Sequence, residues 1–240
     1  MGLTPGEREF VRATSAVLRD PLTSCRGHLE LLSGDPEEQR TTIVLVLSEL
    51  DRMGRILDDL ELLAEAERPD FLHPESIELE EFVHELTEKA SALAPRRWTL
   101  DHAAGGTLLA DRRRLTDAVM NLAQNAVQHT GQGDTIAIGT SVVEDEVRVW
   151  VRDTGRGIAV SEQRRIFERF TRGRGAHRRY RGGGLGLTVV RAIAEAHGGH
   201  VELESRRREG ATFTIVLQCE AEPEPERLEN SVGVVVPHLP

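Results

Sequence analysis

Apolar residues recur at alternating spacings of three and four in two long segments near the start of the chain, residues 6–33 and 40–66. This spacing is a heptad repeat, so each segment is predicted to form a long helix with one apolar seam. The seam of the first helix runs through Val11, Ser15, Leu18, Leu22, Cys25, Leu29 and Leu32, and that of the second through Ile43, Val46, Leu50, Met53, Leu57, Leu60 and Ala64.

The short segment that joins these helices, residues 33–39, contains signals for a helix end and a new helix start. Gly34 suits a helix stop, Asp35 suits an N-cap, and Pro36 suits the first position of a helix. We therefore expect an antiparallel helical hairpin. Because one hairpin buries only one side of each helix, the seams predict a homodimer in which two hairpins form a four-helix bundle.

The rest of the chain alternates shorter helical and β patterns. Two prolines in residues 67–76 predict a linker. Helices are then expected at 78–94, 111–129 and 185–197, and strands at 97–102, 107–111, 135–143, 146–151, 200–205 and 211–218. This order predicts an α/β sandwich, with helices on one face of a mixed sheet.

The predicted fold class is therefore α+β, and the chain divides into four parts. Residues 1–66 form a helical dimerisation domain, 67–76 a linker, and 77–218 the α/β sandwich. Residues 219–240 are an acidic tail whose Glu-Pro repeats predict disorder.

Composition limits the possible functions. The net charge of −10 argues against a nucleic-acid partner. The two cysteines, Cys25 and Cys219, have no metal-type spacing and suggest a reducing compartment. Since the sequence has neither a signal peptide nor an apolar run of roughly 18 residues, we expect a cytoplasmic location. A membrane association is expected only if this chain is part of a longer protein.

Four polar residues are spaced four apart in the predicted helix 111–129. Residues at this spacing lie on one face of a helix, and an acid, two amides and an imidazole are costly to bury there without a ligand. The amide oxygens suit a hard cation such as Mg²⁺. The alternative is an ordinary solvated face. These residues are Asp117, Asn121, Asn125 and His129.

The strand at 146–151 leads into Asp153-Thr-Gly-Arg-Gly-Ile158. A carboxylate at a strand end can accept a hydrogen bond from an exocyclic amino group, which selects adenine, and Gly155 and Gly157 allow a close backbone approach. Residues 171–181 then form a glycine-punctuated loop with five arginines, including Arg172. Such a loop is typical of a mobile lid that meets phosphate charge, although a merely solvated basic loop is the alternative.

Three glycines, Gly182, Gly184 and Gly186, open the predicted helix at 185–197. Glycines at a helix N-terminus expose backbone N–H groups that can bind phosphate. No βαβ unit surrounds them and no Lys-Ser/Thr pair follows, so neither a dinucleotide-binding site nor a P-loop is predicted.

Taken together, these motifs resemble those of bacterial two-component sensor histidine kinases, which belong to the GHKL ATP-binding superfamily. NLAQNA (121–126) resembles the N box, DTGRGI (153–158) the G1 box, FERF (167–170) the F box and GGGLGL (182–187) the G2 box, while GATF (210–213) lies near the last strand. The resemblance covers about residues 6–218.

This resemblance implies a GHKL (Bergerat) sandwich that binds ATP and Mg²⁺, next to a dimerisation and histidine-phosphotransfer hairpin. It implies a response regulator receiver domain, or a partner histidine kinase, as a partner. By the resemblance, Asp153 binds adenine, and Asn125 with Asn121 holds the metal and phosphate. The implied nucleotide-binding residues are Asn121, Asn125, His129, Asp153, Gly155, Gly157, Ile158, Arg172, Gly182, Gly184, Leu185, Gly186, Leu187 and Thr212.

Asn121 also separates branches of the superfamily. ATP-hydrolysing members and anti-sigma serine kinases carry a glutamate general base four residues before the metal-binding asparagine. An amide cannot take a proton from water or from a hydroxyl group. Asn121 therefore favours a histidine kinase over a GHKL ATPase.

The resemblance fails at the phospho-acceptor. The family motif Ser-His-Glu-Leu-Arg-Thr-Pro-Leu aligns without a gap with residues 15–22, but Ala16 replaces the histidine. Val17 replaces the acid that activates it, and Asp20 replaces a residue used in dephosphorylation. Three changes favour natural degeneration over laboratory inactivation. His28 and His84 are possible substitute acceptors, although both are more typical of surface histidines.

These observations leave three hypotheses. In the first, the chain is a histidine kinase core that phosphorylates a histidine of a partner chain, or an inactive form of an ordinary kinase. In the second, it is an ATP-binding pseudokinase that regulates a partner by docking, and in the third, it is a GHKL ATPase. Autophosphorylation at the usual site is predicted to be absent.

Overall fold

The helical hairpin consists of α1 (Pro5–Glu30) and α2 (Pro36–Glu65) in the computed structural model, which describes residues 5–32, 34–168 and 184–218. The predicted capping signals explain where α2 begins. The Asp35 carboxylate accepts a hydrogen bond from the Glu37 backbone N–H at 3.2 Å, and Pro36 is the first helical residue. The helix therefore starts at Pro36 rather than at residue 40.

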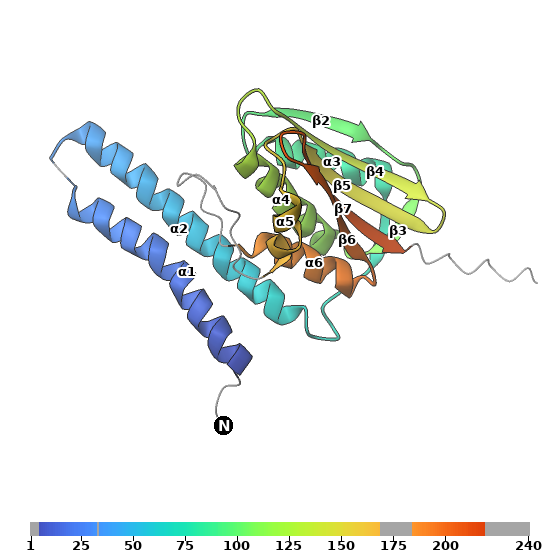
Figure 1. Ribbon diagram of the computed structural model, residues 1–240, viewed down its shortest axis with the longest axis horizontal. Helices are drawn as coiled ribbons and strands as arrows, with labels where there is room; N and C mark the ends of the chain where they lie inside the picture. The colour runs from blue at the N-terminus through green and yellow to red at the C-terminus, as the bar shows by residue number, and fades with distance from the viewer. Residues whose placement is uncertain (1–4, 33, 169–183, 219–240) are drawn as a thin grey trace, which may run out of the picture.

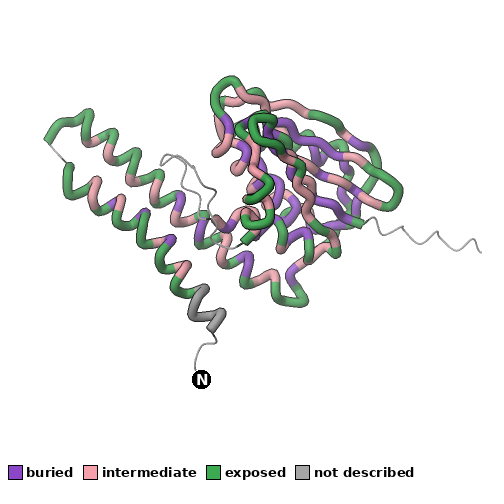
Figure 2. Tube along the Cα trace, viewed as in Figure 1, coloured by how far each residue is buried: buried purple, intermediate pink, exposed green. Residues whose placement is uncertain are grey.

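Most of the predicted apolar seam is uncovered in this single chain. Cys25 is buried, and its Sγ donates to the Val46 carbonyl oxygen at 3.8 Å. Figure 2 shows that much of the hairpin is exposed, whereas buried residues concentrate in the sandwich. An apolar surface therefore remains on the hairpin; it consists of Val11, Leu22, Leu29, Leu32, Ile43, Leu50 and Leu57.

The sandwich begins with a strand that the sequence analysis missed. β1 (Glu75–Glu78) pairs antiparallel with β3 (Thr107–Ala110), so the last two residues of the predicted linker, 75 and 76, belong to the sheet structure. The strand has four residues, of which Ile77 alone is buried. Such a short segment after two prolines carries too little alternation to be recognised.

Within the described residues, the main sheet has five strands in the order β2-β4-β5-β7-β6. β2 runs parallel to β4, and the other neighbours are antiparallel, so the predicted mixed sheet is confirmed. The strands are β2 (Arg97–His102), β4 (Thr135–Val143), β5 (Glu146–Asp153), β6 (His200–Arg206) and β7 (Gly210–Gln218).

Three helices cover one face of this sheet (Figure 1): α3 (Leu79–Ser91), α4 (Arg112–His129) and α6 (Gly186–Ala196). Their apolar faces and the inward side chains of the strands form the core. After β5 come the short helix α5 (Val160–Gln163) and a 3₁₀ turn, Arg165–Phe167, which the sequence analysis did not resolve.

One residue ties the start of the sandwich together. The Asp111 carboxylate caps α4 by accepting from the Arg114 N–H at 2.9 Å, and it also accepts from the His73 N–H at 2.9 Å. The Asp111 N–H donates to His197 Nε2 at 3.1 Å. The segment after the hairpin, the start of α4 and the end of α6 are therefore fixed to one another.

The hairpin packs against the sandwich through α2, which passes next to α6 (Figure 1). Ile56, Leu62 and Leu63 of α2 are buried in the same hydrophobic core as the sandwich helices. At the end of α2, Glu65 forms an ion pair with Arg114 of α4 at 2.6 Å. Among the described helices, none is both long and apolar enough to cross a membrane.

Candidate nucleotide-binding site

A cleft of about 2200 Å³ lies between the hairpin and the sandwich. One wall is formed by α1 and α2, and the other by α4, the end of β5 and the start of α6. The cleft therefore brings together segments that are far apart in the sequence. Its polar residues determine what it can bind.

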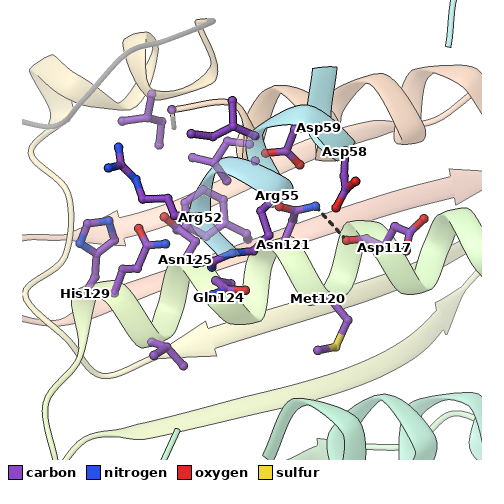
Figure 3. A pocket seen from close by; sticks show the side chains of 18 of the residues that line it. Arg52, Arg55, Asp58, Asp59, Asp117, Met120, Asn121, Gln124, Asn125 and His129 are labelled. Carbon is purple, nitrogen blue, oxygen red and sulfur yellow. Dashed lines mark hydrogen bonds between the residues drawn. The ribbon is translucent and has the colours of Figure 1, made fainter. Parts of the chain in front are cut away.

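The predicted polar face of α4 lines this cleft. Asp117, Asn121, Asn125 and His129 all contribute to its wall (Figure 3). Asn121 Nδ2 donates to the Asp117 carbonyl oxygen at 3.1 Å, which leaves its Oδ1 available. The Asn125 side chain makes no hydrogen bond to any other residue that the structure describes. Two amide groups are thus available to a ligand.

His129 is a neutral imidazole at physiological pH. Burial and the adjacent positive charge of Arg156 lower its pKa to about 4. Arg156 Nη2 lies 3.0 Å from His129 Nδ1. Because a guanidinium group can only donate, Nδ1 must be the acceptor and Nε2 must carry the proton. His129 therefore offers a hydrogen-bond donor without adding charge.

Asp153 lies at the end of β5 and is only 5% exposed. Its Oδ1 accepts a hydrogen bond from the Gly155 N–H at 2.8 Å. Burial raises the pKa of the carboxyl group, while hydrogen bonds from the Gly155 and Ala211 backbones oppose this shift. A buried carboxylate in a cleft wall can select a ligand that donates hydrogen bonds.

The glycines of the two motifs permit close backbone approaches. A Cβ on Gly155 would lie 2.4 Å from the His129 carbonyl oxygen, and one on Gly186 would lie 2.8 Å from Asn121 Oδ1. Gly157 has a φ of +63°, and a Cβ there would lie 1.9 Å from the Arg206 carbonyl oxygen. Any larger residue at these positions would displace the walls of the cleft.

Other predicted residues are divided between the cleft and the rest of the fold. Ile158, Gly184 and Leu187 line the cleft, whereas Leu185 is buried in the core. Thr212 does not line it, although its neighbours in β7 do, because side chains alternate between the two faces of a strand. Arg172 and Gly182 lie outside the described residues.

The residues at the predicted acceptor motif lie on α1. Ala16 is exposed, Val17 is buried against the core, and Asp20 is exposed and lines the cleft. The two candidate substitute acceptors lie elsewhere. His28 is partly buried near the end of α1, and His84 is exposed on α3; neither lines the cleft.

Sequence reasoning missed the contribution of α2 to the cleft. Arg52 and Asp59 both line it, and both lie off the heptad seam, where solvated side chains are expected. Burial, with repulsion from Asp58, raises the pKa of Asp59 to about 7, while Arg55 acts in the opposite direction. The sequence signal for this contribution was an arginine–glutamate pair at a spacing of three, Arg52 and Glu49, but such pairs are common on solvated helix surfaces.

The donor set suits a nucleotide and its bound cation better than a protein-only metal site. Within the described ranges, no cluster of three His, Cys, Asp or Glu side chains could hold a metal ion. Mg²⁺ in proteins is usually held by one or two side chains together with substrate phosphates. The available amide oxygens of Asn121 and Asn125 fit that arrangement.

A polar helix face, a buried carboxylate and paired glycines in a mixed α/β sandwich define a nucleotide-binding domain, here joined to a helical hairpin. Two family models match the chain. Residues 7–69 match the His Kinase A (phospho-acceptor) domain, and residues 110–221 match the histidine kinase-, DNA gyrase B-, and HSP90-like ATPase family. The second match implies ATP binding.

Comparisons with individual proteins agree. The chain is 34% identical over 204 residues to the probable sensor histidine kinase TcrY of Mycobacterium tuberculosis, covering 82% of this chain and 43% of TcrY. The structure of full-length ShkA in complex with AMPPNP matches with a TM-score of 0.61 and 26% identity, over 88% of this chain and 46% of that one. The histidine kinase ThkA in complex with the response regulator TrrA shares the fold, with a TM-score of 0.68 and 24% identity, over 88% of this chain and 61% of that one.

This chain belongs to the sensor histidine kinase family. It spans less than half the length of the curated relatives that it matches.

Proposed function

We propose that this chain is the ATP·Mg²⁺-binding and dimerisation core of a histidine kinase that phosphorylates a histidine on a partner chain. The observation that carries this proposal is a cleft lined by Asn121, Asn125 and Asp153, beside a helix that has Ala16 at the acceptor position of the family motif. An alanine methyl group has no lone pair to attack a phosphoryl group. The cleft keeps its ligand-binding groups even though the nearby acceptor is missing.

The residues of the cleft have distinct proposed roles. Asp153 accepts a hydrogen bond from the amino group of adenine, because its buried carboxylate lies beside the backbone at Gly155. Asn121 and Asn125 hold Mg²⁺ and phosphate through their amide oxygens. His129 donates from Nε2 to an anionic oxygen. When bound, Mg²⁺·ATP supplies the transferable phosphoryl group and neutralises part of its charge. The AMPPNP complex of the related ShkA supports this assignment.

The first helix supports transfer to another chain. Val17 packs into the core, so this position offers neither a carboxylate nor any other base to activate an acceptor. Asp20 lines the cleft but cannot replace an imidazole nucleophile of the family. We therefore propose that autophosphorylation at residue 16 does not occur.

The uncovered seam of the hairpin supports a dimer. Exposed leucines, isoleucine and valine on both helices form an apolar surface that a second hairpin can bury. A homodimer, or a mixed dimer with a histidine-bearing kinase, fits this surface. The structure of ThkA in complex with the response regulator TrrA supports a response regulator as a further partner.

A second candidate function is an ATP-binding pseudokinase that regulates a partner by docking. The same alanine favours it, because nucleotide binding alone can fix the arrangement of hairpin and sandwich. ATP hydrolysis is less well supported, since Asn121 is a neutral amide that cannot act as a general base.

Labelling with γ-³²P ATP and Mg²⁺ tests these functions. The chain is incubated alone and with a homologue that carries the acceptor histidine but has an inactivated nucleotide site. Acid-labile, alkali-stable label on the homologue supports transfer to a partner. Label on this chain alone indicates a substitute acceptor such as His28 or His84. If neither chain is labelled although ATP binding is shown in parallel, the result favours the pseudokinase over the kinase.

A further inference from the structure

Arg52 is a buried cation on the side of α2 that lines the cleft. Its side chain is 9% exposed, and Nη1 forms an ion pair with Glu49 at 3.1 Å. Nε and Nη2 are also buried, and neither has a hydrogen-bond partner in the part of the chain that the structure describes. Figure 3 shows Arg52 among the residues of the cleft, which include Asn125 and His129 of α4.

The two unpaired nitrogens lie on the same edge of the guanidinium group. That edge presents two parallel N–H groups, which match the oxygen spacing of a carboxylate or a phosphate. Two other arginines among the described residues use this edge. Arg68 binds Asp70 through Nε and Nη2 at 3.1 and 3.0 Å, and Arg152 binds Asp101 through the same atoms at 3.1 and 2.7 Å. In Arg52 neither nitrogen of this edge has a hydrogen-bond partner among the described residues.

A buried guanidinium edge without hydrogen-bond acceptors is unfavourable, and an anion would relieve this cost. Buried N–H groups that lose water and gain no acceptor cost free energy, and the cost is larger for charged groups. Glu49 offsets part of the charge but occupies only Nη1. A ligand that brings oxyanions into the cleft would satisfy both remaining nitrogens.

The neighbouring residues indicate which anion this is. Asn121, Asn125 and His129 are the proposed phosphate-binding groups of the same cleft, and His129 is neutral, so it does not compete as a cation. We propose that Arg52 binds the terminal phosphate of ATP, so that the hairpin itself contributes to the nucleotide site. This inference rests on the proposed ATP binding.

Titration calorimetry with the whole chain tests the role of Arg52, using ATP, ADP and AMP with Mg²⁺. Two charged hydrogen bonds lost in Arg52→Met are expected to weaken ATP binding about tenfold to a hundredfold. AMP lacks the β- and γ-phosphates of ATP, so its affinity for Arg52→Met is expected to be within about twofold of its affinity for wild type. Arg40→Met is the matched control. Arg40 lies on the same helix outside the cleft and is exposed, its Nη1 pairs with Glu37 at 3.0 Å at the same spacing of three, and its replacement makes the same change in charge.

Glu49→Gln provides an opposite test that loss of folding cannot imitate. Removing the carboxylate leaves Arg52 without its counter-charge, so ATP is expected to bind severalfold more tightly, with AMP unchanged. Thermal unfolding shows whether each variant is folded. If wild type does not bind ATP, the proposed function fails. If wild type binds ATP, three results each overturn only the role of Arg52. These are unchanged ATP affinity in Arg52→Met, an equal loss for AMP, and no gain in Glu49→Gln.

Discussion

Asp59 should make the stability of this protein depend on pH in an unusual direction. Its carboxyl group titrates near 3.8 when exposed, but in the folded chain burial and Asp58 raise its pKa to about 7. A raised carboxyl pKa means that the folded state binds the proton more tightly than the unfolded state. The stabilisation is complete below pH 3.8 and is lost as the pH rises through 7.

The magnitude follows from the shift. A change of roughly three pH units corresponds to about 4 kcal/mol over the whole window, at 1.36 kcal/mol per unit. Between pH 5 and pH 8.5 about two units remain, or roughly 2–3 kcal/mol. Asp59→Asn removes the ionisation. It should therefore stabilise the chain relative to wild type by that much more at pH 8.5 than at pH 5.

Urea unfolding followed by circular dichroism at the two pH values measures this difference. Asp58→Asn is the companion variant, because Asp58 is exposed and contributes the repulsion that helps to raise the Asp59 pKa. It should reduce the pH dependence without abolishing it. A difference between wild type and Asp59→Asn that is the same at both pH values would refute the reasoning.

Two further predictions concern the ion pair between α4 and α2 and the close backbone approach at Gly157. Arg114→Met removes the 2.6 Å ion pair to Glu65 and the guanidinium contact 4.3 Å above the Phe71 ring. It should lower the free energy of unfolding by about 2–4 kcal/mol, because Glu65 loses its partner at the end of α2. Arg112→Met is the control, because it removes a more exposed ion pair, the one with Glu85. An equal loss of stability in Arg112→Met would contradict this account. Gly157→Ala should destabilise the chain by at least about 1–3 kcal/mol and weaken ATP binding, since its positive φ and the Arg206 carbonyl oxygen leave no room for a methyl group. Thermal unfolding measures the loss of stability, and titration calorimetry measures the loss of ATP affinity. If Gly157→Ala has the stability and affinity of wild type, the backbone can relax around the methyl group and this prediction is wrong.

The sequence predicted the elements whose signals are periodic or chemically distinct. The polar face of α4 follows from a spacing of four, and the start of α2 follows from Asp35 and Pro36, which the structure uses as cap and first residue. The mixed sheet and the hairpin were also predicted. β1 was missed because a four-residue strand with one buried side chain has no usable period.

The role of α2 in the cleft could not be predicted, because it depends on how two domains meet. Arg52 lies off the apolar seam, and a charged residue at such a position is normally solvated. Its burial arises when the sandwich packs against that side of the helix through Ile56 and Leu62. No pattern within α2 encodes this contact.

The two sides of α2 face different surroundings, and this has a mechanical consequence. One side carries the uncovered seam residues Leu50 and Leu57, and the other carries Arg52 and Ile56 against the cleft and core. Side chains lie roughly 5–6 Å from a helix axis, so a turn of about 20° moves them by about 2 Å. That distance separates a hydrogen bond from no bond. A small rotation of this one helix, caused by repacking of the seam, would therefore be enough to make or break a hydrogen bond between Arg52 and a ligand in the cleft.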